Sequence, residues 1–120
     1  MMQVHPNSRN VIPGRVFFTV DFRHPDDAVL ARMDAALREG VERIAGQIGL
    51  ETELEKIFYY ESVRFDVACV ASVRAEAQRF SYSHRDMVSG AGYDACYLAQ
   101  VAPTSMVFVP CVDGISHNEI

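Results

Sequence analysis

The chain has 120 residues, enough for one small domain or for two pieces of a larger protein, and its 49% hydrophobic content excludes a disordered tail. A net charge of −5, with 11 scattered Lys and Arg residues, argues against nucleic-acid and anionic-membrane partners, because both need a clustered basic patch. No apolar run is long enough to span a bilayer and residues 1–13 lack the pattern of a secretory signal, so we expect a cytoplasmic chain.

Three stretches of the first half predict strands and one predicts a helix. In residues 15–23, four apolar side chains alternate with polar ones, so one face packs on a core and the other is polar. The helix begins at Pro25, which fits a first turn because its missing N–H has no partner there, and stops at Gly49. Its apolar residues step by three and four and form a stripe that can cover the apolar face of the strand. The other predicted strands are residues 2–5 and 51–63.

This order of strand, strand, helix and strand predicts an α+β unit. It is a split β-α-β sandwich without its first strand and helix, in which one helix covers an antiparallel sheet. Such a sheet has an under-covered side and an exposed edge, and an exposed edge invites a partner chain.

The second half follows a different, α/β plan. Asp66 predicts the N-cap of a helix that reaches Arg79, and a small-residue turn, residues 89–95, opens a second helix, residues 94–101. The predicted strands on either side of that turn and helix are residues 85–89 and 104–109. A strand, tight turn, helix and strand form a parallel crossover unit.

The change of plan predicts a domain boundary near residues 62–66. We therefore assign residues 1–63 to one domain and residues 64–120 to another.

The turn that contains Gly90, Gly92 and Tyr93 is a candidate anion site. Backbone N–H groups at a helix start can bind a carboxylate or a tetrahedral oxyanion. The alternative is an ordinary strand-to-helix turn with Asp94 as the N-cap, and the spacing matches neither a dinucleotide fingerprint nor a phosphate loop.

Asn10 and Arg23 lie at either end of a predicted hairpin arm. An Arg can hold a carboxylate with two parallel N–H bonds, and an Asn amide can add a further contact. The alternative is a turn-forming Asn and a surface Arg that pairs with a nearby acid such as Asp26.

His117 is the best candidate metal ligand, because it follows a predicted strand and loops at the carboxyl end of a strand gather ligands in α/β sheets. The alternative is a solvated loop histidine. Three cysteines without a C-x-x-C spacing argue against a disulfide framework and a thiolate zinc site, and no serine has a placed base.

Three segments together resemble the C-terminal part of the M20-type amidohydrolases, which include N-carbamoyl-L-amino acid hydrolases, β-ureidopropionases and allantoate amidohydrolases. They are PNSRNVIPGRVFFTVDFRHP (residues 6–25), SGAGYDA (residues 89–95) and MVFVP followed by GISH (residues 106–110 and 114–117). The resemblance covers essentially the whole chain.

The resemblance implies a hydrolase with a divalent metal pair, zinc or manganese, that cleaves a ureido amino acid by attack of a metal-bridging hydroxide. Residues 1–63 would be the latter part of a lid that forms a homodimer, and residues 64–120 the end of the catalytic domain. His117 matches the last metal ligand of the family. Asn10 and Arg23 match lid residues that hold the substrate carboxylate, and Gly92 matches a loop glycine that meets the substrate.

Two departures from the family pattern have consequences. Tyr93 replaces the histidine of the usual Gly-Ala-Gly-His-Asp motif, and a phenol can donate a hydrogen bond but does not take up and release protons at neutral pH. The remaining ligands and the catalytic glutamate of the family are not in this chain, so we predict that it binds no metal stably and is inactive alone. The alternatives are a non-catalytic dimerisation module and a degenerate, truncated family member.

Overall fold

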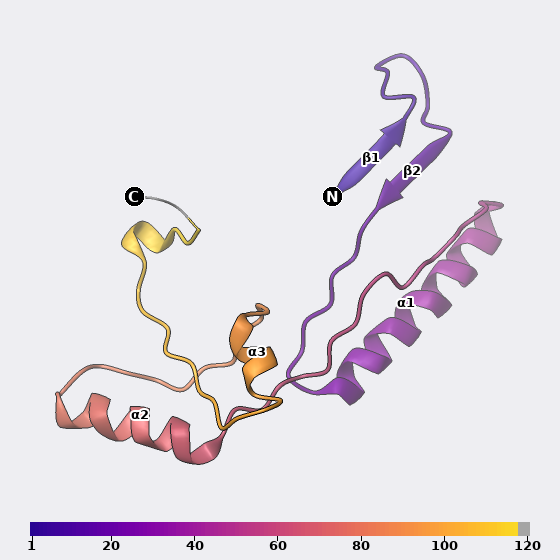
Figure 1. Ribbon diagram of the computed structural model, residues 1–120. Helices are drawn as coiled ribbons and strands as arrows, with labels where there is room; N and C mark the ends of the chain where they lie inside the picture. The colour runs from indigo at the N-terminus through magenta and orange to yellow at the C-terminus, as the bar shows by residue number, and fades with distance from the viewer. Residues whose placement is uncertain (118–120) are drawn as a thin grey trace. The chain divides into compact units, whose positions relative to one another are not determined.

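The structure is a computed structural model that describes residues 1–117, and it divides into two compact units. Unit 1 is Met1–Tyr59 and unit 2 is Tyr60–Ile120. The described part holds a small antiparallel sheet, three α-helices and one short 3-10 helix (Figure 1). These elements make the chain a partial α+β structure.

Unit 1 begins with a hairpin. Strands β1 (Met2–His5) and β2 (Arg15–Phe18) pair antiparallel, with Met2 opposite Phe18 and His5 opposite Arg15. The Gly14 N–H donates to the His5 carbonyl oxygen over 2.9 Å and closes the loop end of the arm. The strand predicted for residues 15–23 therefore ends at Phe18, where pairing with β1 ends.

Helix α1 (Asp27–Ile48) confirms the predicted helix, and local interactions fix both ends. The Asp26 carboxylate accepts the Ala28 N–H over 2.8 Å, and Gly49 adopts a left-handed conformation with φ of 70°. The predicted start at Pro25 was wrong by two residues, because Asp26 is the capping residue and lies after the proline.

Unit 2 contains α2 (Val67–Arg79) and α3 (Asp94–Leu98). The helix predicted from Asp66 to Arg79 is confirmed, because the Asp66 carboxylate accepts the Cys69 N–H over 2.8 Å. Helix α3 is shorter than predicted and its N-cap is Tyr93, so the expectation that Asp94 caps it was wrong. The 3-10 helix η1 (Val112–Gly114) follows in the chain.

Three segments that were predicted to be strands are not strands in the structure. They are residues 51–63, 85–89 and 104–109. An extended segment becomes a strand only when a neighbour pairs with its N–H and C=O groups, and β1 and β2 pair with each other. The lid and crossover assignments consequently stay predictions.

Very little apolar surface is buried. Of the hydrophobic residues that the structure describes, one is buried, Ala45, with 7% of its surface exposed. The accessible surface is 10834 Å², whereas the size scaling of folded proteins gives about 6,500 Å² for one domain and about 7,800 Å² for two separate halves. Neither unit has therefore closed a hydrophobic core of its own.

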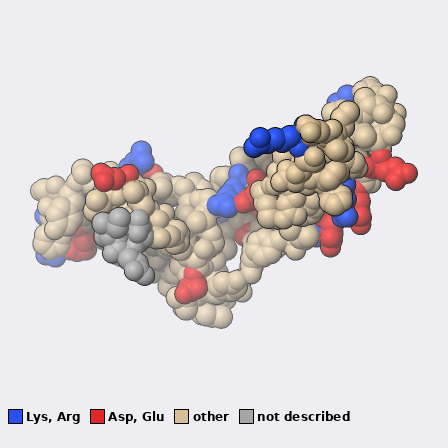
Figure 2. Space-filling view, turned by 90° about the horizontal axis from the view of Figure 1, so that it is seen from above, with Lys and Arg blue, Asp and Glu red and all other residues tan. Residues whose placement is uncertain are grey.

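Charged side chains are dispersed on the face that Figure 2 shows, where Lys and Arg lie interspersed with Asp and Glu among other residues. None of the described helices is both long enough and apolar enough to cross a bilayer.

Candidate functional site

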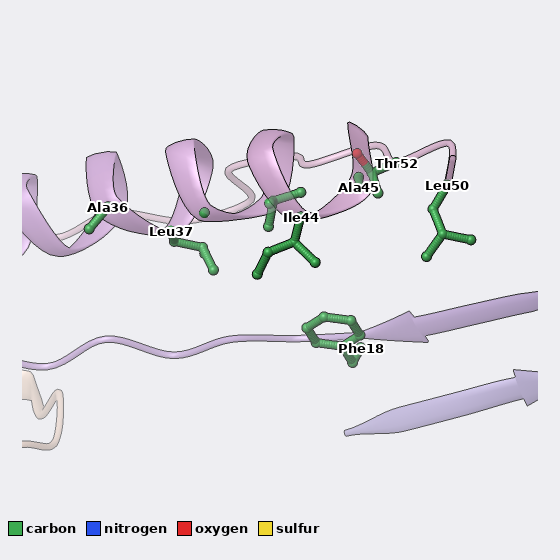
Figure 3. A pocket seen from close by; sticks show the side chains of 9 residues that line it. Phe18, Ala36, Leu37, Ile44, Ala45, Leu50 and Thr52 are labelled. Atoms are coloured by element: carbon green, nitrogen blue, oxygen red, sulfur yellow. The ribbon is translucent and has the colours of Figure 1, made fainter. Parts of the chain in front are cut away.

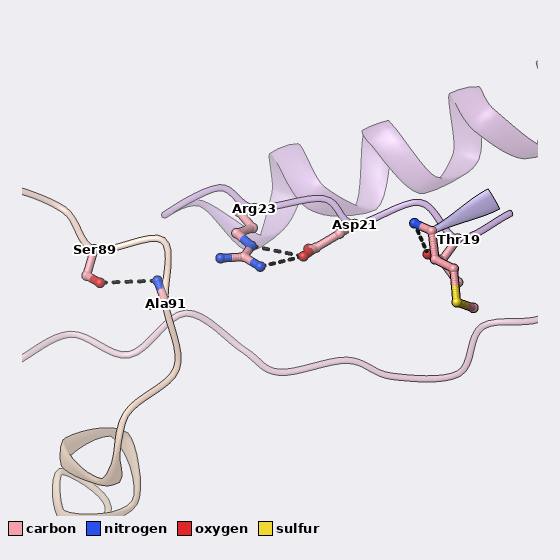
Figure 4. A network of polar contacts seen from close by, with 6 residues as sticks. Thr19, Asp21, Arg23, Ser89 and Ala91 are labelled. Carbon is pink, nitrogen blue, oxygen red and sulfur yellow. Dashed lines mark hydrogen bonds and ion pairs between the residues drawn. The ribbon is translucent and has the colours of Figure 1, made fainter. Parts of the chain in front are cut away.

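Arg23 lies on the extended segment between β2 and α1 and is held by Asp21. Its Nε donates to the Asp21 Oδ2 atom over 3.0 Å, and its Nη2 donates to the same oxygen over 2.6 Å (Figure 4). The two side chains are 60% and 64% exposed, so solvent and ligands can reach the pair. The acid suggested by the sequence, Asp26, instead caps α1.

The ion pair fixes the charge of both groups. The hydrogen bond from Arg23 lowers the pKa of the Asp21 carboxyl, and the hydrogen bond to Asp21 raises the pKa of the Arg23 guanidinium. Arg23, like any arginine, is a cation at physiological pH and suits an anionic ligand.

Asn10 lies in the hairpin loop, at the other end of the arm from Arg23. Arg23 lies eight positions after Arg15, which is at the loop end of β2, and extended chain of that length spans about 26 Å. The described chain does not bring Asn10 and Arg23 together, and their shared role at one carboxylate stays a prediction.

The turn before α3 is held by its own residues. The Ser89 Oγ accepts the Ala91 N–H over 3.1 Å (Figure 4), and a Cβ placed on Gly92 would meet nothing within 4 Å. The Tyr93 ring lies edge-on to Phe108, with 5.9 Å between ring centroids, and makes no capping hydrogen bond to α3. This geometry leaves the Gly92 and Tyr93 substrate contacts as predictions.

His117 is exposed and has a φ of 57°, a left-handed conformation that is uncommon for a residue with a side chain. Within residues 1–117, no three His, Cys, Asp or Glu side chains gather into a group that could hold a metal ion. A catalytic zinc needs about three protein ligands, so these residues alone do not fit a metal pair. The role of His117 as a ligand stays a prediction.

Sequence reasoning missed an apolar hollow in unit 1. It has a volume of about 350 Å³ and lies between α1 and the end of β2 (Figure 3). Phe18 faces Leu37 and Ile44 of the helix across it. The apolar stripe of α1 was the signal for this hollow, and its lining suits apolar side chains and not a charged substrate. The full lining is Phe18, Ala36, Leu37, Gly40, Val41, Ile44, Ala45, Leu50 and Thr52.

Asp21 was a second omission. The sequence places Asp21 and Arg23 two residues apart on one face of an extended segment, which was the available signal.

Comparisons with known proteins place the chain in a single family. The model of peptidase family M20/M25/M40 matches residues 4–120. An N-carbamoyl-L-amino-acid amidohydrolase of Rhizobium meliloti is 48% identical over 95% of this chain, and an allantoate amidohydrolase of Escherichia coli K12 is 35% identical over 98%. Among solved structures, an amidase of the hydantoinase/carbamoylase family from Burkholderia multivorans is 83% identical, with a TM-score of 0.94 over 99% of this chain.

The chain corresponds to only part of each of these proteins. It spans 27% and 28% of the length of the two curated relatives and 29% of the Burkholderia multivorans protein.

Proposed function

Since the chain belongs to peptidase family M20/M25/M40, we propose that it is the C-terminal part of a hydrolase that cleaves the ureido C–N bond of N-carbamoyl amino acids. The similarity to the Rhizobium meliloti N-carbamoyl-L-amino-acid amidohydrolase along nearly the whole chain carries this proposal. The exposed cation Arg23 supports it, because these substrates have a free carboxylate.

Residues 1–63 belong to a lid domain in this proposal, and residues 64–120 belong to the catalytic domain. The division between the compact units, at Tyr59 and Tyr60, supports this boundary because it falls within a few residues of it. A homodimer formed through the lid is the proposed assembly, since unit 1 presents an exposed two-stranded sheet and an apolar hollow.

Arg23 is the proposed contact for the substrate carboxylate, through two parallel N–H bonds. Asn10 is the weaker member of the proposed pair, because the extended arm separates it from Arg23. Gly92 would allow close approach of the backbone to the substrate, and the Tyr93 hydroxyl would donate a hydrogen bond where the family has a histidine.

His117 is the residue of this chain that would bind the divalent metal pair, with zinc or manganese as the candidate ions. When bound, such a metal pair would polarise the carbonyl group of the substrate and activate a water molecule. In this proposal the chain contributes substrate binding and one metal ligand, since residues 1–117 hold no group of three metal-binding side chains.

A chimera tests the proposed function. In it, this chain replaces the matching 29% of the Burkholderia multivorans protein, an exchange that 83% identity makes structurally conservative. We expect the chimera to release ammonia from N-carbamoyl-L-alanine with added zinc or manganese, and the isolated chain to release none above background.

The parent Burkholderia multivorans protein is the control for folding, and the Rhizobium meliloti enzyme is the control for the assay. A chimera that folds like its parent but does not turn over a substrate that the parent hydrolyses would contradict the proposed function. Turnover by the isolated chain would contradict the proposed dependence on the remaining polypeptide.

A non-catalytic dimerisation module is the second candidate, and the exposed apolar surface of unit 1 favours it. Sedimentation of the isolated chain distinguishes the two, because a stable monomer would count against a dimerisation module. A degenerate family member is a third candidate, and activity of the chimera would count against it.

A further inference from the structure

We infer that Phe108 is a positioning residue, which holds the Tyr93 ring so that the Tyr93 hydroxyl is directed at the substrate. The inference rests on the proposed function, because it takes Tyr93 as a substrate contact. It adds Phe108 to that site and gives it a role that can be measured apart from the role of Tyr93.

The Tyr93 side chain is held by its ring and not by its hydroxyl. The ring lies edge-on to the Phe108 ring at an interplanar angle of 61°, and the 5.9 Å between their centroids is in the range of attractive aromatic pairs. Within residues 1–117, the Tyr93 hydroxyl makes no hydrogen bond. Phe108 thus fixes the body of the ring and leaves the polar end to a further partner.

Most of the other tyrosines are held differently. The hydroxyls of Tyr60 and Tyr97 hydrogen-bond to each other, and the Tyr59 hydroxyl donates to the Asp27 carboxylate over 3.4 Å. In the part of the chain that the structure describes, Tyr93 shares an unbonded hydroxyl with Tyr82. An unbonded hydroxyl is therefore a feature of Tyr93 that can serve a ligand.

Phe108 is itself anchored through the segment that carries it, residues 104–109. The Thr104 carbonyl oxygen at the start of this segment accepts the backbone N–H of Asp66 over 2.9 Å, and Asp66 caps α2. The Tyr93 side chain turns about two single bonds, and a neighbouring ring that restricts both lowers the entropy that the hydroxyl loses on meeting a ligand.

Stabilisation of the fold is the competing explanation for the aromatic pair. Tyr93 is 36% exposed and Phe108 is 39% exposed, so a ligand can reach Tyr93 while Phe108 contacts it. The two explanations differ in what they require of Tyr93. Stabilisation requires only the two rings, whereas positioning also requires the hydroxyl. Tyr93→Phe keeps the ring pair and removes the hydroxyl, so this substitution separates the explanations.

The chain offers a matched control in Phe80 and Tyr82. Their ring centroids are also 5.9 Å apart, in a stacked arrangement at 24°, and the Tyr82 hydroxyl likewise makes no hydrogen bond within residues 1–117. Phe80 lies at the end of α2, and the pair belongs to no candidate site. Phe80→Leu therefore reports the general effect of removing an aromatic partner from a tyrosine of unit 2.

The first test measures kcat/KM for ammonia release from N-carbamoyl-L-alanine by the chimera with added zinc or manganese. We expect Tyr93→Phe to lower kcat/KM about tenfold and Phe108→Leu to lower it about fivefold, since each disturbs one hydrogen bond to the substrate. In a Tyr93→Phe background, Phe108→Leu should have no further effect. Phe80→Leu should leave kcat/KM unchanged.

The second test observes the Tyr93 ring without turnover, by fluorine NMR of the metal-free chimera labelled with fluorotyrosine. The Tyr93 line is identified by its absence from Tyr93→Phe. We expect this line to narrow in Phe108→Leu, because the ring gains mobility, and to be unchanged in Phe80→Leu. Phe108→Met is a second variant without the ring and should behave like Phe108→Leu. Circular dichroism checks that each variant is folded.

Three results would overturn the inference. They are an unchanged kcat/KM in either Phe108→Leu or Tyr93→Phe, a loss from Phe108→Leu that persists in the Tyr93→Phe background, and a Tyr93 fluorine line that Phe108→Leu does not alter. Failure of the proposed function gives a different pattern, in which the unsubstituted chimera folds like its parent and releases no ammonia. The fluorine line then still tests whether Phe108 holds the ring.

Discussion

Among the candidate site residues, Arg23 has the most fully described surroundings. Its Nε and Nη2 atoms donate to the Asp21 carboxylate, and both side chains are more than half exposed. His117 and Tyr93 have less local support, since His117 has no group of metal-binding neighbours among residues 1–117 and Tyr93 packs on Phe108. The proposed substrate-binding role of Arg23 therefore has more local support than the proposed roles of His117 and Tyr93.

Tyr93→His in the chimera restores the residue that the family has at this position. An imidazole can both donate a hydrogen bond and exchange a proton near neutral pH, whereas a phenol forms hydrogen bonds but does not titrate near neutral pH. We expect kcat on N-carbamoyl-L-alanine to rise about tenfold with little change in KM, measured by ammonia release.

Tyr93→Phe is the matched variant, because it keeps the ring and removes the hydroxyl. If Tyr93→His and Tyr93→Phe gave the same kcat as the unsubstituted chimera, position 93 would have no contact with the reacting groups.

The helices are the elements that local interactions fix most completely. Asp26 caps α1 and Asp66 caps α2 through their carboxylates, and Gly49 ends α1. The two helices differ in their contacts with the rest of their units. Helix α1 lines the apolar hollow. At the start of α2, the backbone N–H of Asp66 donates to the Thr104 carbonyl oxygen over 2.9 Å. The start of α2 therefore depends on Asp66 through both its side chain and its backbone.

The Asp66 cap predicts an acid-sensitive start of α2. The backbone hydrogen bond from Cys69 lowers the pKa of the Asp66 carboxyl below its ordinary value of 3.8. A group with a lowered pKa in the folded state stabilises that state above its unfolded pKa, and this contribution is lost as the pH falls through the folded pKa. We expect the first turn of α2 to loosen below pH 3.8 and not above it.

NMR titration of the Asp66 carboxyl carbon, with the Cys69 amide shift followed in parallel, measures this effect. Asp66→Asn is the control, because asparagine caps a helix without a titrating charge and should make the Cys69 shift independent of pH in this range. An Asp66 midpoint above 3.8 would contradict the prediction.

The whole molecule exposes more surface than folded proteins of the same mass do. Its 10834 Å² exceed the scaling value for two separate half-size domains by about 3,000 Å². The chain also spans little more than a quarter of its relatives. From these observations we predict that polypeptide corresponding to the remaining length of the relatives, as in the chimera, would cover the apolar faces of both units.

We therefore expect the isolated chain to bind a hydrophobic dye strongly and to unfold without a cooperative transition. In the chimera, the same residues should bind little dye and unfold cooperatively, because their apolar faces are covered. Dye fluorescence and scanning calorimetry measure the two properties. A sharp transition of the isolated chain without dye binding would show that its core is closed.

The sequence by itself determined the features that depend on near neighbours. The spacing of apolar residues and the capping residues predicted α1 and α2, and residues 2–5 predicted β1, because these patterns act over a few residues. Three short motifs in a fixed order also predicted the family, which the match to its model confirms.

Only the tertiary structure decided which extended segments become strands and which candidate residues meet. Three segments have strand-like sequences but form no strand in the structure, namely residues 51–63, 85–89 and 104–109. A strand forms only when another segment pairs with it, and a segment's own sequence does not supply that partner. Likewise, the candidate site residues do not come together through local sequence. The extended arm separates Asn10 from Arg23, and His117 has no group of metal-binding neighbours among residues 1–117. A composite site forms through long-range contacts, and a periodic pattern carries no information about them.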